Sequence, residues 1–360
     1  MLVERLWARS PLPPFDCSAM DGYAVRGPGP WRVTGQVLAG EVGGGELTDG
    51  AAVEVATGAP VPTGCEGVVP YEAGVRVDDE LTAPAPLGRH VRRRGEEVPA
   101  WTALLPAGTR LSPAAVGLAA AVGTDTLLVA PRPRVAVLVT GSELVGVGVP
   151  DPGRVRDALT PLLPPTLVAA GASVSAVAVV RDDATLLGAA LDRACAGADV
   201  VVVTGSTAAG PADVLRPVLA GLGAVCEVDG VACRPGHPML LARLPGGVRV
   251  VGLPGNPLAA LAGLVTLVVP LVAGLRGLPV PPLLPARLAR PLRAHPRDTR
   301  LVPVRRRAGI ALPTGHDGPA MLRGAALADG LALVRAGPDV PAGADVGVLD
   351  LPGAGPGPGG

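Results

Sequence analysis

The 360-residue chain contains no lysine, so arginine supplies all 31 of its basic residues. A Walker-type phosphate loop is thereby excluded, because the lysine of that loop reaches the nucleotide phosphates. The dinucleotide fingerprint GxGxxG is also missing after every strand that we expect. Basic and acidic residues balance to a net charge of zero, and no basic run is long. Nucleic acid is therefore not expected as a partner, although a local anion site remains compatible with the composition.

Cysteines and long apolar segments are scarce as well. The five cysteines are scattered without a CxxC pair, so we expect inert thiols rather than a zinc site or a disulfide framework. The apolar residues 258–269 are too few to span a bilayer and lie between Pro257 and Pro270. The first residues, MLVERLWARSPLPP, lack the hydrophobic region of a signal peptide. We therefore expect a cytoplasmic protein without a membrane partner.

Apolar residues are abundant, at 48% of the chain, and 51 glycines and 42 prolines punctuate them. This content is enough for several hydrophobic cores. Short alternating runs between turns indicate β-rich regions, whereas strands separated by helical patterns indicate a mostly parallel α/β sheet. The expected parts are a linker domain formed by residues 1–13 and 95–133, a small β-rich domain at 14–94, an α/β domain at 134–277, a β-barrel-like domain at 278–352 and a disordered tail at 353–360.

The α/β domain is expected to contain four strands, each followed by a loop and a helix, and further extended pieces around residues 225–243. The strands are expected at residues 134–140, 172–180, 199–205 and 248–255. The helices are expected within 141–170, at 184–196, at 211–222, and at 257–275 with a kink at Pro270. Ser112 and Pro113 should begin a further short helix in the linker domain.

The loops at the carboxyl ends of these strands should meet at one edge of the sheet. They are TGSEL (140–144), RDD (181–183), TGSTAAGPAD (204–213) and LPGNP (253–257). Each loop has a simpler explanation by itself: a capping box formed by Thr140 and Glu143, a solvated turn, a tight turn before a helix, or a first-turn acid at Asp213. Open α/β sheets bind ligands at this edge, so the four loops together predict a ligand site.

The residue types near these loops suggest a phosphate-bearing ligand that is handled together with a divalent metal. Backbone amides of residues 205–210 could face an anion at the start of a helix. Arg234 and His237, in CRPGHP, could add positive charge. Carboxylate oxygens, which Mg²⁺ prefers, are offered by Glu143, Asp182, Asp183 and Asp213.

Eight motifs, taken in their order, resemble the MoeA family, the molybdopterin molybdenumtransferases, to which the E domain of gephyrin is similar. The motifs are SAMDGYAV (18–25), ATGAPVPTG (56–64), GEEV (95–98), TGSEL, RDD, TGSTAAGPAD, RPGHP (234–238) and LPGNP. The likeness covers nearly the whole chain and includes MLRGAALADGLALV (321–334). SAMDGYAV and LPGNP together in this order are highly specific.

This resemblance implies a multi-domain α/β plus β fold and an enzyme of molybdenum cofactor biosynthesis. The implied reaction inserts molybdenum from molybdate into adenylylated molybdopterin, with Mg²⁺ as cofactor and release of AMP. The resemblance also implies a homodimer, in which the β-rich domain of one subunit and the α/β domain of its partner enclose the site. The linker domain would serve dimerisation and is truncated, because the family's N-terminal helix and the following strand are missing.

The resemblance also implies roles for particular residues. Catalytic roles fall to Asp21, Thr57, Glu143, Asp183 and Asp213, with Glu143 and Asp213 as Mg²⁺ ligands. Substrate-binding roles fall to Gly205, Ser206, Gly210, Arg234, His237, Pro254, Asn256 and Pro257. Arg234 and His237 stand where family members have lysines that bind the anionic ligand. Arginine keeps the charge and can bind phosphate with its fork, whereas histidine is charged only when protonated.

Departures from the family pattern motivate two alternatives. TGDEL has become TGSEL at Ser142, the Asp-x-Asn after the first strand has become Asp157-Ala158-Leu159, and GGxSxG is altered at residues 205–210. A catalytically impaired relative that binds molybdopterin or acts as a scaffold is the first alternative. The second is a molybdopterin adenylyltransferase, whose single α/β domain is similar to residues 134–277. The flanking domains argue against this second alternative.

Overall fold

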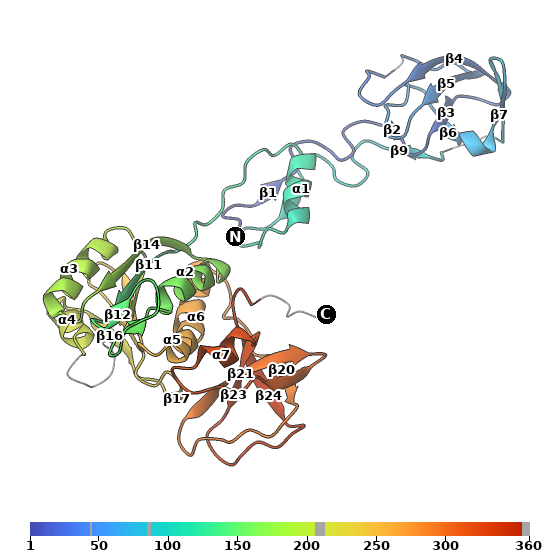
Figure 1. Ribbon diagram of the computed structural model, residues 1–360. Helices are drawn as coiled ribbons and strands as arrows, with labels where there is room; N and C mark the ends of the chain where they lie inside the picture. Colours follow the sequence, from blue (N-terminus) through green and yellow to red (C-terminus); the bar gives the residue numbers. More distant parts are fainter. Residues whose placement is uncertain (44, 85–87, 206–212, 355–360) are drawn as a thin grey trace. The chain divides into compact units, whose positions relative to one another are not determined.

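The computed structural model describes residues 1–43, 45–84, 88–205 and 213–354. The chain forms two compact units, unit 1 from residues 1–130 and unit 2 from residues 131–360, and each is described by itself (Figure 1). The division falls at the Pro-rich residues that end the expected linker domain. The finer domain boundaries stay predictions.

Unit 1 contains a six-stranded sheet in the order β6-β3-β5-β4-β8-β7. Its elements are β3 (Gly22–Val25), β4 (Trp31–Val37), β5 (Ala51–Val55), β6 (Gly67–Pro70), the 3₁₀ turn η1 (Tyr71–Ala73), β7 (Val75–Val77) and β8 (Glu80–Thr82). Ala24 enters one hydrophobic cluster and its neighbours Tyr23 and Val25 enter another, as the two-residue period of a strand requires. A Cβ on Gly22 would lie 2.0 Å from the Val69 carbonyl oxygen, so glycine permits the close pairing of β3 with β6.

The remainder of unit 1 combines short strand pairs with one helix. The pairs are β1 (Leu6–Trp7) with β10 (Ala103–Leu105), and β2 (Cys17–Ser18) with β9 (Val91–Arg92). The helix α1 (Pro113–Ala121) begins where the sequence predicts it. The Ser112 hydroxyl accepts the backbone N–H of Ala115 at 3.2 Å, which satisfies one of the free donors at the helix start.

Unit 2 is built on a six-stranded sheet in the order β14-β11-β15-β19-β18-β16. The strands are β11 (Arg134–Thr140), β14 (Ser173–Val180), β15 (Val200–Thr204), β16 (Val225–Asp229), β18 (Leu240–Arg243) and β19 (Arg249–Leu253). The first four strands in this order pair in parallel, while β18 and β16 run antiparallel to their neighbours. The prediction of a mostly parallel sheet is confirmed.

Helices cover both faces of this sheet (Figure 1). One face holds α2 (Leu159–Ala169), α5 (Pro257–Gly263) and α6 (Val269–Leu275), and the other holds α3 (Ala184–Cys195) and α4 (Leu215–Gly221). Val137 of β11 enters the first core and its neighbours Ala136 and Leu138 enter the second. Burial on both faces explains why the strands are continuous apolar runs.

The helix α2 occupies the last part of residues 141–170, the range in which a loop and a helix are expected. Residues 141–158, all of them described, hold instead a short parallel strand pair formed by β12 (Leu144–Val145) and β13 (Val155–Arg156). The capping box suggested for Thr140 and Glu143 is therefore wrong, because no helix begins in these residues. The helix expected at 211–222 likewise starts at Leu215.

The apolar segment that begins with the last residue of LPGNP is a helix long enough to cross a membrane by length and composition. The expectation that this segment is too short to span a bilayer is therefore wrong. α5, the π-helical turn η2 (Leu264–Val268) and α6 follow each other from Pro257 to Leu275. In unit 2, 61% of the most apolar window of this helix is buried. The π-turn lies just before Pro270, where proline removes a backbone donor and a kink is expected. The apolar character of this helix is therefore explained by packing in the core.

A closed β-barrel completes unit 2 and confirms the barrel-like prediction. Its elements are β20 (Leu284–Leu288), β21 (Thr299–Arg307), β22 (Ile310–Pro313), α7 (Leu322–Ala326), β23 (Gly330–Val334) and β24 (Asp345–Asp350). β21 pairs with both β22 and β23 and so closes the ring. A strand from outside the barrel, β17 (Cys233–Arg234), pairs in parallel with the start of β21.

Gly324 of α7 generates a test of this packing. A Cβ at this position would lie 2.1 Å from the carbonyl oxygen of Gly315 and 2.8 Å from that of His316. We expect Gly324→Ala to lower the free energy of unfolding by about 1–3 kcal/mol in urea denaturation, because backbone must move to admit the methyl group. The control is Gly274→Ala in α6, where a Cβ would meet no atom within 4 Å apart from its chain neighbours and the backbone of its own helix, and where helix propensity favours alanine. Equal losses in both variants would contradict the packing.

Candidate functional site

The carboxyl ends of β11, β15 and β19 meet, as the sequence predicts. The Thr140 hydroxyl donates to the Thr204 carbonyl at 2.7 Å, and the Gly205 N–H donates to the Leu253 carbonyl at 3.0 Å. Gly205 has a φ of +78°, and a Cβ there would lie 2.5 Å from Thr140 Oγ1. Only glycine combines this backbone angle with so close an approach. Gly205 thus has a structural task in forming the edge.

The loops after β11 and β14 are joined by two reciprocal hydrogen bonds. The Ser142 N–H donates to Asp182 Oδ2 at 2.8 Å, and the Asp182 N–H donates to Ser142 Oγ at 3.2 Å. Asp183 Oδ1 accepts the N–H of Leu186 at 2.9 Å and caps α3. The Glu143 side chain is exposed. Ser142 therefore has a hydrogen-bond partner in the RDD turn. Asp183 caps a helix, and the sequence alone could not distinguish this role from that of a ligand-binding residue.

Asp213 is the most unusual acid at this edge. Its side chain is 9% exposed, and its Oδ2 accepts from Arg216 at 2.8 Å. Its Oδ1 is buried and has no hydrogen-bond partner among the residues that the structure describes. Asp213 precedes α4 rather than lying in its first turn, which corrects the first-turn reading of this residue. The predicted residues Ser206 and Gly210 lie outside the described residues.

The acids at this edge suit Mg²⁺ only if a ligand completes the coordination. Within residues 1–43, 45–84, 88–205 and 213–354, no group of three or more His, Cys, Asp or Glu could hold a metal ion. The predicted pair, Glu143 and Asp213, offers an exposed carboxylate and an unpaired carboxylate oxygen. Mg²⁺ is commonly bound by one or two protein carboxylates together with water and substrate phosphates. Glu143 and Asp213 each offer one such carboxylate.

A pocket of about 240 Å³ lies where the α/β part of unit 2 meets the barrel. It is lined by the predicted residues Arg234, His237, Pro254 and Asn256 and also by Arg300 and Asp317. Asn256 precedes α5 without a side-chain capping bond, so its amide is not used by the helix. Pro257 is the first residue of that helix. The structure thus brings together the RPGHP and LPGNP motifs, which are 15 or more residues apart in the sequence.

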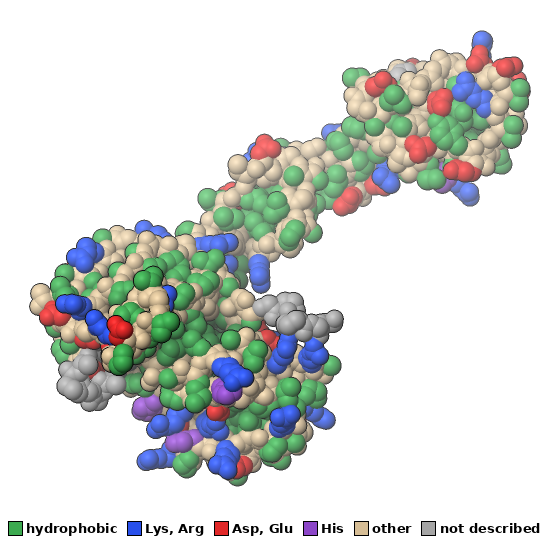
Figure 2. Space-filling model, in the orientation of Figure 1, with side chains coloured by type: hydrophobic (Ala, Val, Ile, Leu, Met, Phe, Trp, Pro, Cys, Tyr) green, Lys and Arg blue, Asp and Glu red, His purple; other side chains and the backbone are tan. Residues whose placement is uncertain are grey.

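Charged residues of the barrel at this pocket were missed in the sequence analysis. Arg300 forms an ion pair with Asp317, and Arg234 Nε donates to Asp298 Oδ2 at 2.6 Å. The Arg234 guanidinium holds the pKa of the Asp298 carboxyl below its usual range. Arginine side chains, with histidine beside them, also gather over the barrel on the face shown in Figure 2. The only sequence signals for these residues were the polar clusters RDTR and GHDG within β-like runs.

The departure at Asp157-Ala158-Leu159 has a structural consequence. Asp157 is buried, and its Oδ1 accepts the N–H groups of Leu159 and Thr160 at 2.9 and 3.0 Å. Leu159 is 5% exposed and belongs to the main hydrophobic core. The acid therefore caps α2, and the side chain in place of the family's Asn contributes to packing rather than to a ligand site.

The predicted residues of unit 1 also form a local pair. Asp21 Oδ1 accepts the N–H of Thr57 at 2.8 Å, and both residues are exposed. Gly58, next to Thr57, donates its N–H to the Ser18 carbonyl at 2.8 Å. The motifs SAMDGYAV and ATGAPVPTG, which lie more than 30 residues apart, therefore meet on one surface of the β-rich domain.

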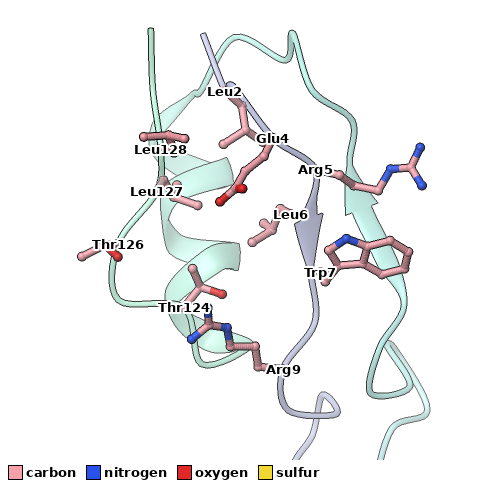
Figure 3. Close-up of a pocket in the computed structure, with 10 residues that line it drawn as sticks. All are labelled: Leu2, Glu4, Arg5, Leu6, Trp7, Arg9, Thr124, Thr126, Leu127 and Leu128. Carbon is pink, nitrogen blue, oxygen red and sulfur yellow. The ribbon is translucent and has the colours of Figure 1, made fainter. Parts of the chain in front are cut away.

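A second pocket, also of about 240 Å³, lies in unit 1 between α1 and the N-terminal strand (Figure 3). The Glu4 side chain points between the strand and α1 toward Leu6, and Arg9 lies near Thr124 (Figure 3). None of the predicted site residues is among those lining it. This pocket is therefore separate from the residues that the motifs single out.

Three family models together match most of the chain. They are "MoeA N-terminal region (domain I and II)" at residues 1–123, "Probable molybdopterin binding domain" at 136–274 and "MoeA C-terminal region (domain IV)" at 285–351. The first model covers most of unit 1, the second covers the α/β sheet, and the third covers the barrel.

Curated relatives and solved structures agree with these matches. The chain is similar to "Molybdopterin molybdenumtransferase 2" of Mycobacterium tuberculosis, with 36% identity over 89% of this chain and 84% of the relative. It is also similar to "Molybdopterin molybdenumtransferase" of a Nostoc species, with 36% identity over 74% of this chain and 64% of the relative. The structure of a molybdopterin biosynthesis MoeA protein from Pyrococcus horikosii superimposes with a TM-score of 0.81 at 29% identity, covering 98% of this chain and 92% of that one.

The cysteine next to Arg234 generates a test of the site's chemistry. Burial raises the pKa of the Cys233 thiol to about 11, so the unreactive protonated form prevails at pH 8. We expect iodoacetamide at pH 8 to modify the exposed Cys226 in the folded protein and to leave Cys233 unmodified, as read by peptide mass spectrometry. Both should react after unfolding in urea. Modification of Cys233 in the folded protein as fast as Cys226 would show that the thiol is accessible and activated.

Proposed function

Because this chain belongs to the MoeA family, we propose that it inserts molybdenum from molybdate into adenylylated molybdopterin and releases AMP. The enzyme class follows from relatives named molybdopterin molybdenumtransferase that align with most of the chain. One observation supports the chemistry above all: the buried Asp213 Oδ1, just before α4, has no hydrogen-bond partner among the described residues. A buried oxygen without a partner is costly, so such an atom is expected where a ligand completes its contacts.

In this proposal, different charged residues of unit 2 act on different anionic groups of the substrates. Glu143 and Asp213 would hold Mg²⁺, and the ion would supply positive charge that favours the departure of AMP. Arg234 and Arg300, which line one pocket, attract the oxyanion, and the guanidinium fork can make two parallel hydrogen bonds to it. Asn256 adds a side-chain amide that makes no capping hydrogen bond to α5. Asp21 and Thr57 of unit 1 are proposed to be needed for the same reaction.

A binding or scaffold protein without turnover is the second candidate, and one observation favours it. Leu159 is buried in the core where the family pattern has an Asn, so one polar group of that pattern is missing from the edge. The charged groups Glu143, Asp183 and Asp213 are nevertheless present. An adenylyltransferase is less well supported, because the family models at residues 1–123 and 285–351 lie outside an α/β domain.

An assay of AMP release tests the proposed reaction. Purified protein is incubated with adenylylated molybdopterin, molybdate and Mg²⁺, and AMP and the molybdenum cofactor are measured. We expect both products, with release dependent on Mg²⁺, and a loss of about 100-fold in Asp213→Asn, the order typical of removing one group that stabilises developing charge. Asp192→Asn, an exposed acid of α3, should keep full activity. Tight molybdopterin binding without AMP release would favour the second candidate instead.

We further propose a homodimer, which the resemblance to the family implies. Light scattering coupled to size-exclusion chromatography measures the molar mass of the particle directly. We expect about twice the chain mass of 35.7 kDa. A mass equal to that of one chain at micromolar concentration would refute this part of the proposal and leave the reaction assay unaffected.

A further inference from the structure

Arg234 reaches the pocket from a short strand that is attached to the barrel. β17 places Cys233 beside Thr299 and Arg234 beside Arg300, in parallel register with β21. Asp298 lies immediately before β21, and its Oδ2 accepts from Arg234 Nε at 2.6 Å. Arg234 is thus held at the start of β21 in two ways, by the backbone pairing of β17 with β21 and by its ion pair with Asp298.

The ion pair uses only one edge of the guanidinium. Nε bonds Asp298, and within the described residues no contact is recorded for the two terminal nitrogens of Arg234. The Arg234 side chain is 56% exposed and lines the pocket, whereas the Asp298 side chain is 11% exposed. The buried carboxylate therefore anchors the inner edge of the fork, and the outer edge remains available for two hydrogen bonds to an oxyanion.

Asp298 is itself held in place. Its N–H donates to His295 Nδ1 at 2.9 Å, and the N–H of Arg297 donates to the same nitrogen at 3.2 Å. His295 Nδ1 also lies 3.4 Å from Asp298 Oδ2. The charged or titratable groups that act on Asp298 are Arg234, His295 and His237. The backbone at Asp298 is therefore held in place, and the carboxylate is largely buried.

We infer that Asp298 is a positioning residue that orients Arg234 toward an oxyanion in this pocket. The inference rests on the proposed function, because it takes Arg234 as a residue that binds the anionic substrate. An arginine side chain loses rotamer entropy on binding, and an anchor on Nε removes part of that cost beforehand. A lysine has no comparable second edge to anchor, so this device belongs to a chain with arginine at position 234.

Orientation and simple electrostatics predict opposite effects for the loss of Asp298. A negative carboxylate near the pocket repels an oxyanion, so neutralising it should tighten binding if charge alone matters. If orientation dominates, the same change should weaken binding, because the fork loses its anchor. The sign of the change therefore separates the two explanations without any assumption about its size.

The test measures molybdate affinity by calorimetry and KM and kcat for molybdate in the AMP-release assay. In Asp298→Asn we expect Kd and KM to rise about tenfold, the size of a coupling between contacting residues, with kcat within about twofold. In the Arg234→Lys background the same substitution should change neither value. Asp298→Glu, which keeps the charge but moves the carboxylate, should also raise Kd and provides a second variant if Asp298→Asn does not fold.

The matched control is Glu227→Gln, which breaks another Arg Nε–carboxylate pair, that of Arg243 at 2.9 Å, and should leave Kd and KM unchanged. Unchanged or tighter molybdate binding in Asp298→Asn overturns the inference while the proposed function stands. An equal loss in the Arg234→Lys background, or a fall in kcat at constant KM, also overturns it. Failure of the unaltered protein to bind molybdate would refute the assigned role of Arg234, and with it this inference.

Discussion

The parallel pairing of β15 between β11 and β19 is the constraint on which the site of unit 2 depends. It requires Gly205 to turn with a positive φ directly against Thr140. It also brings Gly255 close to Gly205, because a Cβ on Gly255 would lie only 3.4 Å from the Gly205 Cα. Backbones can approach so closely only where side chains are absent. Because the three strand ends are fixed together, Thr140, Gly205 and Gly255 lie at one edge of the sheet.

Much of the architecture could be predicted because its causes are local. Uninterrupted valines between helical patterns indicate strands buried on both faces, and the Ser-Pro pair at 112–113 marks a helix start. The exact starts of α2 and α4 could not be predicted in the same way. β12 and β13 form a two-residue ladder whose stability comes from its surroundings, and the bonds that hold it, such as Val155 N–H to the Glu143 carbonyl, join residues without a distinctive pattern.

The barrel side of the pocket escaped prediction for a physical reason as well. Asp298 is 64 residues from its partner Arg234, and Arg300 is 17 residues from Asp317. Their meeting depends on barrel closure and on the parallel pairing of β17 with β21, and neither is encoded in a short motif. Periodicity finds strands, but it does not say which polar residues at their ends will share a pocket. The motif residues Arg234 and Asn256 were therefore identified from sequence. Asp298, which contacts Arg234, and Arg300 and Asp317, which line the same pocket, were not.

The positions at which this chain departs from the family pattern have different structural roles. Where the family pattern has a neutral Asn, Leu159 now fills the core and Asp157 has a capping role, so that position is committed to stability. Where it has a lysine, Arg234 keeps the positive charge and gains an anchor in Asp298. Asp213 keeps a buried oxygen unpaired even though Arg216 is close enough to bind its other oxygen. A chain under pressure for stability alone would not retain that cost, because an apolar residue of similar size would remove it. Arg234 and Asp213 thus keep the charge of the family pattern, whereas Ser142, Leu159 and His237 replace polar or charged residues of that pattern.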